Sequence, residues 1–190
     1  MTLPTLAKFF TIGFLLVLVA SPAPCQKQNN IWEFGDSLGI DFNSGKPLLL
    51  LDGVLQYPGF FTLANPGSGV GSIADRNTGK LLFYCSGHRG VFNRKHQLMG
   101  TPPDSSSTET VIIVPMGCDT NKYVICSNDD GWQTDQQHYN YDGPPIIAYS
   151  IVDMTQDNGY GAVVTSPYEL LRGSSDRLTA LPHANGTDSW

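Results

Sequence analysis

The stretch GSIADRNTGKLLFYCSGHRGVFNRKHQLM, residues 71–99, alternates short apolar runs with tight polar turns. Within it, DRNTG (Asp75–Gly79) lies between two apolar runs and places a glycine where a hairpin needs a positive backbone angle. SIAD and KLLFY are therefore predicted to pair as antiparallel strands, and a third short strand follows the next turn. A unit of this kind predicts an all-β fold.

The same arrangement recurs further along the chain. GCDTN (Gly117–Asn121) separates VIIVP from KYVICS, and Asn185-Gly186 marks a turn near the chain end. The aromatic strands at Tyr84 and Tyr123 are 39 positions apart. Repeated antiparallel units of about 40 residues are typical of propeller blades. The expected antiparallel WD40-like blades cover residues 31–64, 70–99 and 107–166, with a further blade beginning within 177–190.

The number of units is small for such a fold. A β-propeller closes with about four to eight blades, and this chain holds only about three and part of another. The sequence therefore predicts an incomplete propeller. Either the chain is a fragment of a longer protein, which is the expectation preferred here, or it covers an open sheet edge by self-association.

Composition limits the class of protein. The chain has 190 residues, enough for one domain with a real core. Hydrophobic residues make up 41% and charged residues 15%, and 20 glycines and 13 prolines are spread along the chain, which favours many short elements joined by turns. The net charge is −6, and no basic run is longer than Arg94-Lys95. Nucleic acid is therefore not an expected partner.

The N-terminus predicts export. Phe9–Ala20 is an apolar run that is too short to span a bilayer but typical of a secretory signal peptide. Residues 1–25 are interpreted as the signal peptide and 26–190 as the mature domain, with no transmembrane segment after its removal. Cleavage after Ala20 or after Cys25 fits, and lipid attachment at Cys25 is an alternative. The mature protein is expected to be secreted or held at the cell surface.

The cysteines allow two interpretations. Without Cys25 three remain, so at least one thiol stays unpaired in a monomer. Cys118 and Cys126 flank a predicted hairpin and form a possible disulfide in an oxidising compartment. Alternatively, Cys85 and Cys126 are small apolar side chains on buried strands. No cysteine spacing matches a zinc site.

Carboxylates gather in glycine-containing loops, where hard oxygen ligands could hold calcium. The candidate ligands are Asp36, Asp41, Asp129 and Asp130. No loop matches the full EF-hand pattern, and Asp favours turns through local hydrogen bonds alone, so turn chemistry is the alternative. No cofactor other than a possible calcium ion is expected.

The insertion between residues 127 and 145 supplies the candidate ligand-binding residues. Trp132, Tyr139 and Tyr141 stand there among Asp, Gln and Asn, a composition suited to stacking on sugars or contacting a protein. The alternative is a surface loop whose aromatic side chains fold back on the sheet edge. No GxSxG motif occurs and no carboxylate pair is singled out, so no catalytic residue is predicted.

Five segments carry a family resemblance. They are IWEFGDSLGIDFNSGKP (31–47), SIADRNTGKLLFYCSGHRGVFNRKHQLM (72–99), SSSTETVIIVP (105–115), IIAYSIVDM (146–154) and DRLTALPHANGTDSW (176–190). In this order they resemble the N-terminal, propeller-like region of large secreted gliding-motility-associated proteins, which carry a C-terminal type B sorting domain for type IX secretion. The resemblance implies a propeller, export and a cell-surface life, and no catalytic residues. The sequence departs from it at Glu33 and at Cys85, Cys118 and Cys126, and it holds no sorting domain.

These observations lead to one functional expectation with two alternatives. The leading interpretation is an exported, non-enzymatic binding or scaffold module that presents loops to a glycan or a surface protein. The first alternative is a carbohydrate-active propeller enzyme, a glycosidase or lyase, which needs two carboxylates across a pocket. The second is a structural spacer of a large adhesin, which has no ligand.

Overall fold

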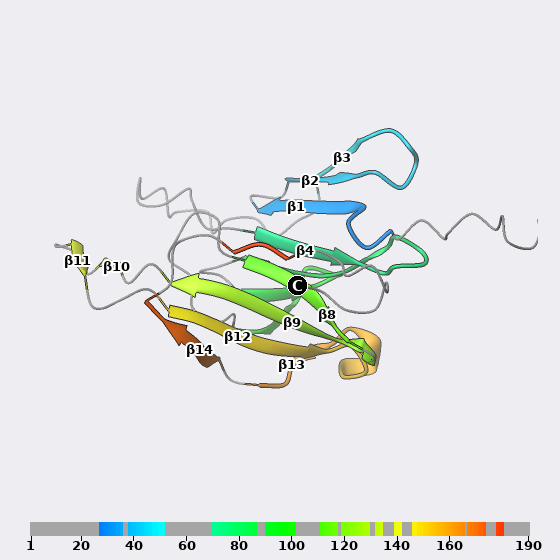
Figure 1. Ribbon diagram of the computed structural model, residues 1–190. Helices are drawn as coiled ribbons and strands as arrows, with labels where there is room; N and C mark the ends of the chain where they lie inside the picture. The colour runs from blue at the N-terminus through cyan, green and yellow to red at the C-terminus, as the bar shows by residue number, and fades with distance from the viewer. Residues whose placement is uncertain are drawn as a thin grey trace, which may run out of the picture.

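The described part of the chain folds mainly into antiparallel strands (Figure 1). The computed structural model describes residues 27–35, 38–51, 70–86, 90–101, 111–117, 119–129, 132–134, 139–141, 146–165, 167–173 and 178–180. In these residues the helical structure is one 3-10 turn, η1 (Asp157–Gly159), and none of them belongs to a helix that could span a membrane. The prediction of an all-β fold is confirmed.

The first two sheets follow each other along the chain. The first contains β1 (Ile31–Gly35), β2 (Leu38–Asp41) and β3 (Leu48–Leu50), and the second contains β4 (Val70–Ala74), β5 (Leu81–Ser86), β6 (Gly90–Asn93) and β7 (Leu98–Gly100). The predicted β4–β5 hairpin is confirmed: Gly79 has a φ of 75°, and Asp75 Oδ1 accepts hydrogen bonds from the amides of Asn77 and Thr78.

The third sheet has the strand order β13-β12-β9-β8. Its strands are β8 (Val111–Met116), β9 (Asp119–Asp129), β12 (Ile146–Asp153) and β13 (Ala162–Val163), and β14 (Tyr168–Arg172) pairs with β12 on the same edge as β13. Val114 lies opposite Val124, so the second predicted hairpin is also confirmed. Between β9 and β12 the chain forms a separate two-stranded sheet of β10 (Trp132–Thr134) and β11 (Tyr139–Tyr141).

The core lies between the second and third sheets. Its buried side chains are Ile73, Phe83, Cys85, Val91, Tyr123, Ile125, Val152 and Met154. The rings of Phe83 and Tyr123 meet edge to face at 5.5 Å. The first strands β4 and β8 contact each other, and so do the last strands β7 and β13. A Cβ on Gly100 would lie 2.8 Å from Val163 Cβ, so the contact between β7 and β13 requires glycine.

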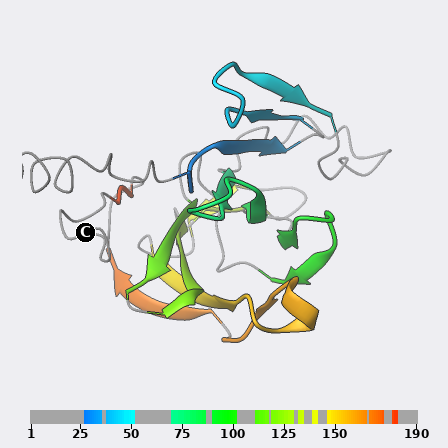
Figure 2. The ribbon, with the colours of Figure 1, turned by 90° about the vertical axis from the view of Figure 1, so that its right-hand side faces the viewer.

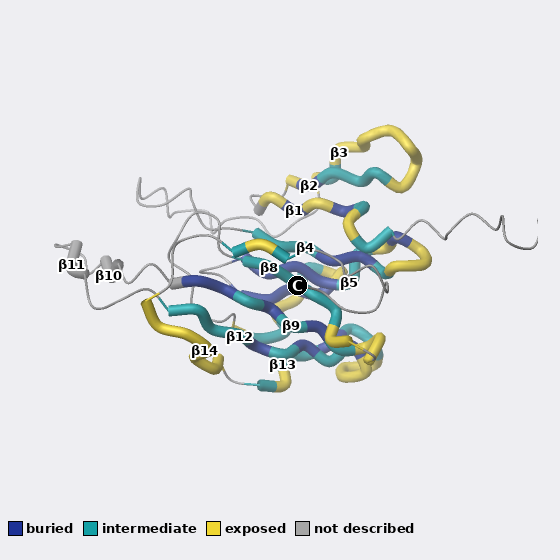
Figure 3. Tube along the Cα trace, in the orientation of Figure 1, coloured by how far each residue is buried: buried dark blue, intermediate teal, exposed yellow. Residues whose placement is uncertain are grey.

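The first sheet covers the other face of the second sheet (Figure 2). Ile31 and Glu33 of β1 are buried there, and Ser72 Oγ of β4 donates to Ile31 O at 2.8 Å and accepts from Glu33 N at 3.3 Å. Tyr84 and Phe92 stack on this face with ring centroids 5.5 Å apart. Because both faces of the second sheet are covered, all of β6 and the last four residues of β5 are buried (Figure 3).

Three features differ from the sequence predictions. The described sheets do not close into a propeller. Leu38–Asp41 forms strand β2, although the sequence suggested a metal-binding loop around it. The strands β7, β10, β11 and β14 were not predicted: Leu98–Gly100 is short, β10 and β11 lie in the polar insertion, and Tyr168–Arg172 carries two charges in five residues. The sheet topology is therefore richer than the sequence pattern indicates.

Candidate functional site

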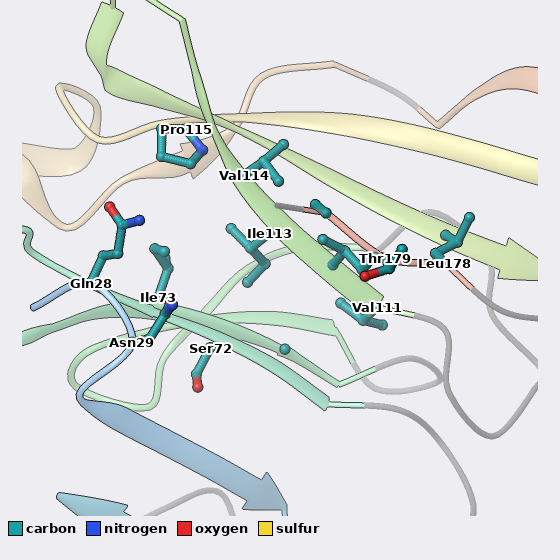
Figure 4. Close-up of a pocket in the computed structure, with 13 residues that line it drawn as sticks. Gln28, Asn29, Ser72, Ile73, Val111, Ile113, Val114, Pro115, Leu178 and Thr179 are labelled. Atoms are coloured by element: carbon teal, nitrogen blue, oxygen red, sulfur yellow. The ribbon is translucent and has the colours of Figure 1, made fainter. Parts of the chain in front are cut away.

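A cavity of about 350 Å³ lies where the first strands of the second and third sheets meet (Figure 4). We call it the inner-strand cavity. It is formed by the segment before β1, by β4, by β8 and by a segment after β14. Its lining residues are Gln28, Asn29, Gly71, Ser72, Ile73, Val111, Ile112, Ile113, Val114, Pro115, Leu178, Thr179 and Ala180.

Local backbone chemistry builds two of its walls. Ala74 N of β4 donates to Gln28 O at 2.8 Å, and Lys27 N donates to Arg76 O at 3.1 Å, so the segment before β1 is tied to the end of β4. On the facing wall β8 crosses close to β4, since a Cβ on Gly71 would lie 3.0 Å from Val111 Cγ1. The absence of a side chain at position 71 therefore lets β4 and β8 approach closely at this wall.

The lining of the cavity is mostly aliphatic, with a few uncharged polar groups. The aliphatic side chains belong to Ile73, Val111, Ile112, Ile113, Val114, Pro115, Leu178 and Ala180. Gln28 and Asn29 contribute amides and Thr179 a hydroxyl, and Figure 4 shows Gln28 beside Pro115 at one end and Thr179 beside Leu178 at the other. None of the lining residues has an ionisable side chain.

The second hydroxyl of the cavity lining, that of Ser72, already has hydrogen-bond partners. Ser72 Oγ donates to the carbonyl of Ile31 and accepts from the amide of Glu33, so it joins the first and second sheets. A serine nucleophile needs a base within hydrogen-bond reach, and none of the residues lining this cavity is one. The cavity offers shape, apolar contact and amide hydrogen bonds, which is the chemistry of binding.

The aromatic residues predicted to bind a ligand lie on the β10–β11 hairpin. Its register places Trp132 opposite Tyr141 and Thr134 opposite Tyr139, so the hairpin brings the three aromatic positions together. Their side chains lie outside the described residues. Their binding role therefore stays a prediction.

The calcium candidates are only partly covered by the structure. Asp36 and Asp130 lie outside the described residues, and of Asp129 only the backbone, at the end of β9, is described. Asp41 Oδ1 accepts from Asn43 N at 2.7 Å, which is a turn interaction. The described part of the chain contains no group of three or more His, Cys, Asp or Glu placed to hold a metal ion. At Asp41 the turn interpretation therefore accounts for the carboxylate.

The structure describes two of the four cysteines, Cys85 and Cys126. Cys126 carries a free thiol on β9, opposite Ile112. Cys118 lies outside the described residues, so the predicted Cys118–Cys126 disulfide stays a prediction. Burial raises the pKa of the Cys85 thiol to about 12, which fits the alternative of a small core side chain.

One cluster was missed by the sequence interpretation. Arg94 and Lys95, in the turn between β6 and β7, lie over the Tyr160 ring at 4.5 and 4.0 Å from its centre. Arg94 Nη1 also donates to Gly159 O at 2.9 Å. A hydrogen bond from Lys95 lowers the pKa of Tyr160. The only signal in the sequence is the Arg-Lys pair itself, whose aromatic partner is 65 positions away from Lys95. The cluster joins the outer turns of two sheets.

Comparisons of the chain with models of protein families, with curated proteins and with solved structures found no match. The resemblance to secreted gliding-motility-associated proteins therefore stays a prediction from sequence.

Proposed function

We propose that the chain is an exported, non-enzymatic binding module whose inner-strand cavity holds an uncharged sugar unit of a glycan. One observation carries the proposal. The cavity combines aliphatic walls with amides and a hydroxyl, and none of its lining residues is ionisable. A neutral sugar offers hydroxyl groups to the amides and C–H faces to the walls, whereas a buried charged ligand would lack a counter-charge.

In this proposal the sheets are blades of an incomplete propeller. Two observations support this. The second and third sheets each contain four antiparallel strands in meander order, β4-β5-β6-β7 and β8-β9-β12-β13. Strand β4 contacts β8, and strand β7 contacts β13. Propeller blades stack in this way around a central channel. Leu178–Ala180 lines the same cavity as β4 and β8, as the first strand of a further blade would. The cavity is then part of that channel.

The alternatives make different demands on this site. A glycosidase needs two carboxyl groups about 5 to 10 Å apart across the substrate, and the residues that line the cavity include no carboxylate. A surface-protein ligand would use the β10–β11 hairpin instead. A structural spacer would bind nothing.

The test is binding of the exported protein to immobilised neutral and acidic oligosaccharides. The double variant Gln28→Ala/Asn29→Ala removes the two amides but keeps the backbone bonds that hold this segment. Loss of two hydrogen bonds of about 1 kcal/mol each predicts roughly 10- to 30-fold weaker binding to neutral glycans. The control, Asn77→Ala, removes an exposed turn amide that is not among the lining residues and should bind as the parent does.

The other outcomes separate the alternatives. Binding lost only in Trp132→Ala/Tyr139→Ala/Tyr141→Ala moves the site to the hairpin and rejects the cavity. Preference for acidic glycans contradicts an uncharged ligand. Release of reducing sugar supports an enzyme, and no binding to any glycan, with the fold intact, supports a spacer.

A further inference from the structure

The first sheet has one apolar face that nothing in the described part of the chain covers. In register, Trp32 of β1 lies opposite Ile40 of β2, and Ile40 lies opposite Leu49 of β3. Directly opposed residues of antiparallel strands share a face, and so do residues two apart. We call this the outer face. Its six residues are Trp32, Phe34, Leu38, Ile40, Phe42 and Leu49.

The outer face is exposed and internally ordered. Trp32, Phe34 and Leu49 expose 49%, 52% and 66% of their surface, whereas Ile31, on the opposite face, exposes 5%. The Trp32 ring meets those of Phe34 and Phe42 edge to face at 6.4 and 5.2 Å. Contiguous apolar patches of this kind mark interaction sites on soluble proteins.

We propose that the outer face joins two copies of this chain, face to face about a two-fold axis. The outer face exposes enough surface area for a specific interface. With roughly 100 Å² exposed by each of the large side chains, a pair of outer faces buries about 1,000 Å², the size at which specific interfaces begin. The inference goes beyond the proposed glycan binding and does not depend on it.

The outer face is also uncharged, although the chain as a whole is acidic. Each copy carries a net charge of −6, so two copies repel each other over most approaches. None of the six residues of the outer face is charged, so the contact itself brings no like charges together. A second β-sheet with the same pleated apolar surface packs against this one at about 10 Å.

A two-fold axis through the outer face gives a closed dimer. At the other end of the stack, the third sheet also turns apolar side chains away from the core, and Tyr168 and Leu171 of β14 are 62% and 54% exposed there. Lys122 and Asp153 share that face of the third sheet, so the exposed apolar face without charged residues is the one on the first sheet. Pairing it with itself gives a closed isologous dimer, whereas joining unlike ends produces an open chain of molecules.

The test measures the mass of the exported protein by light scattering across a dilution series. We expect twice the chain mass in the micromolar range and the single mass on dilution. In a Trp132→Phe/Trp190→Phe background, quenching of Trp32 by acrylamide should fall as the dimer forms. A single mass at every concentration overturns the proposal. A Trp32 shielded in the monomer does too, because another part of the protein would then cover the face.

Matched variants locate the interface. Leu49→Lys places a charge on the outer face and should weaken dimerisation at least 100-fold. Leu170→Lys changes an equally exposed leucine of β14, 62% exposed, and should leave the dimer intact. Phe34→Glu provides a second disruption if the first variant fails to fold, which a thermal melt reports. Equal dissociation by the Leu170 variant, or none by either outer-face variant, overturns the proposal.

Discussion

The first and second sheets are built from similar apolar strands but are covered differently. The second sheet lies between the first and third sheets, so all of β6 and the last four residues of β5 are buried. The first sheet is covered on one face, where Ile31 and Glu33 are 5% and 4% exposed, whereas Trp32 and Phe34 on its other face are 49% and 52% exposed. The difference shows that the position of a sheet in the stack, more than the composition of its strands, determines how far its side chains are buried.

The largest expected effect compares two phenylalanines. Phe83 is fully buried in the core, and Phe34 is 52% exposed on the outer face. Phe83→Ala leaves a cavity and should lower the free energy of unfolding by about 3–5 kcal/mol. Phe34→Ala should lower it by about 1 kcal/mol or less. Urea unfolding, at a concentration where the chain is monomeric, measures both. Equal losses would mean that the first sheet is as well packed as the second.

The next effect compares two glycines. Gly100→Ala, in the second sheet, pushes a methyl group to 2.8 Å from Val163 Cβ and should cost about 1–3 kcal/mol. Gly45→Ala, in the β2–β3 turn, meets open space, and its φ of 77° alone should cost about 1 kcal/mol. Chemical denaturation gives both values.

A double variant tests the cause of that loss. If the clash with Val163 is responsible, Gly100→Ala/Val163→Gly, which removes the Cβ that the new methyl group meets, should be more stable than the sum of the two single effects predicts. Strict additivity of the unfolding free energies would instead place the cost in the backbone of β7.

Local chemistry made much of the fold predictable. The turns at Asp75–Gly79 and Gly117–Asn121 specify hairpins because Asp and Gly satisfy turn hydrogen bonds and positive φ angles within a few residues. The core strands at Phe83 and Ile125 were likewise recognisable from their apolar runs. Where the information lies within one turn or one strand, the sequence displays it.

Other features depend on contacts that no local pattern contains. The inner-strand cavity brings together Gln28, Gly71, Val111 and Leu178, which are far apart in the chain. Strand β2 was read as a loop because Asp36 and Asp41 drew the interpretation toward a metal. The sequence shows that Trp32 and Phe34 lie on one face of β1, at alternate positions of the strand. Whether that face is covered depends on how the sheets stack.

The smallest effect compares the turns of the two sheets. Asp75 accepts backbone hydrogen bonds from Asn77 and Thr78 at 3.1 and 2.7 Å, whereas Asp41 accepts one, from Asn43. At pH 7 we expect Asp75→Ala to cost about 1 kcal/mol and Asp41→Ala about half of that, since fewer amides lose a partner.

The pH dependence identifies the source of the Asp75 effect. The backbone bond from Thr78 is the main cause that lowers the pKa of Asp75 below its ordinary value of 3.8. A lowered pKa contributes stability above the unfolded pKa, and this contribution is lost as the pH falls through the folded pKa. The gap in urea midpoint between the parent protein and Asp75→Ala should therefore be full at pH 7 and narrow markedly below about pH 4. A gap of unchanged size in acid would mean that the ionised carboxylate does not stabilise the hairpin, and the turn of the second sheet would then owe its stability to Gly79 and to the packing of β4 and β5.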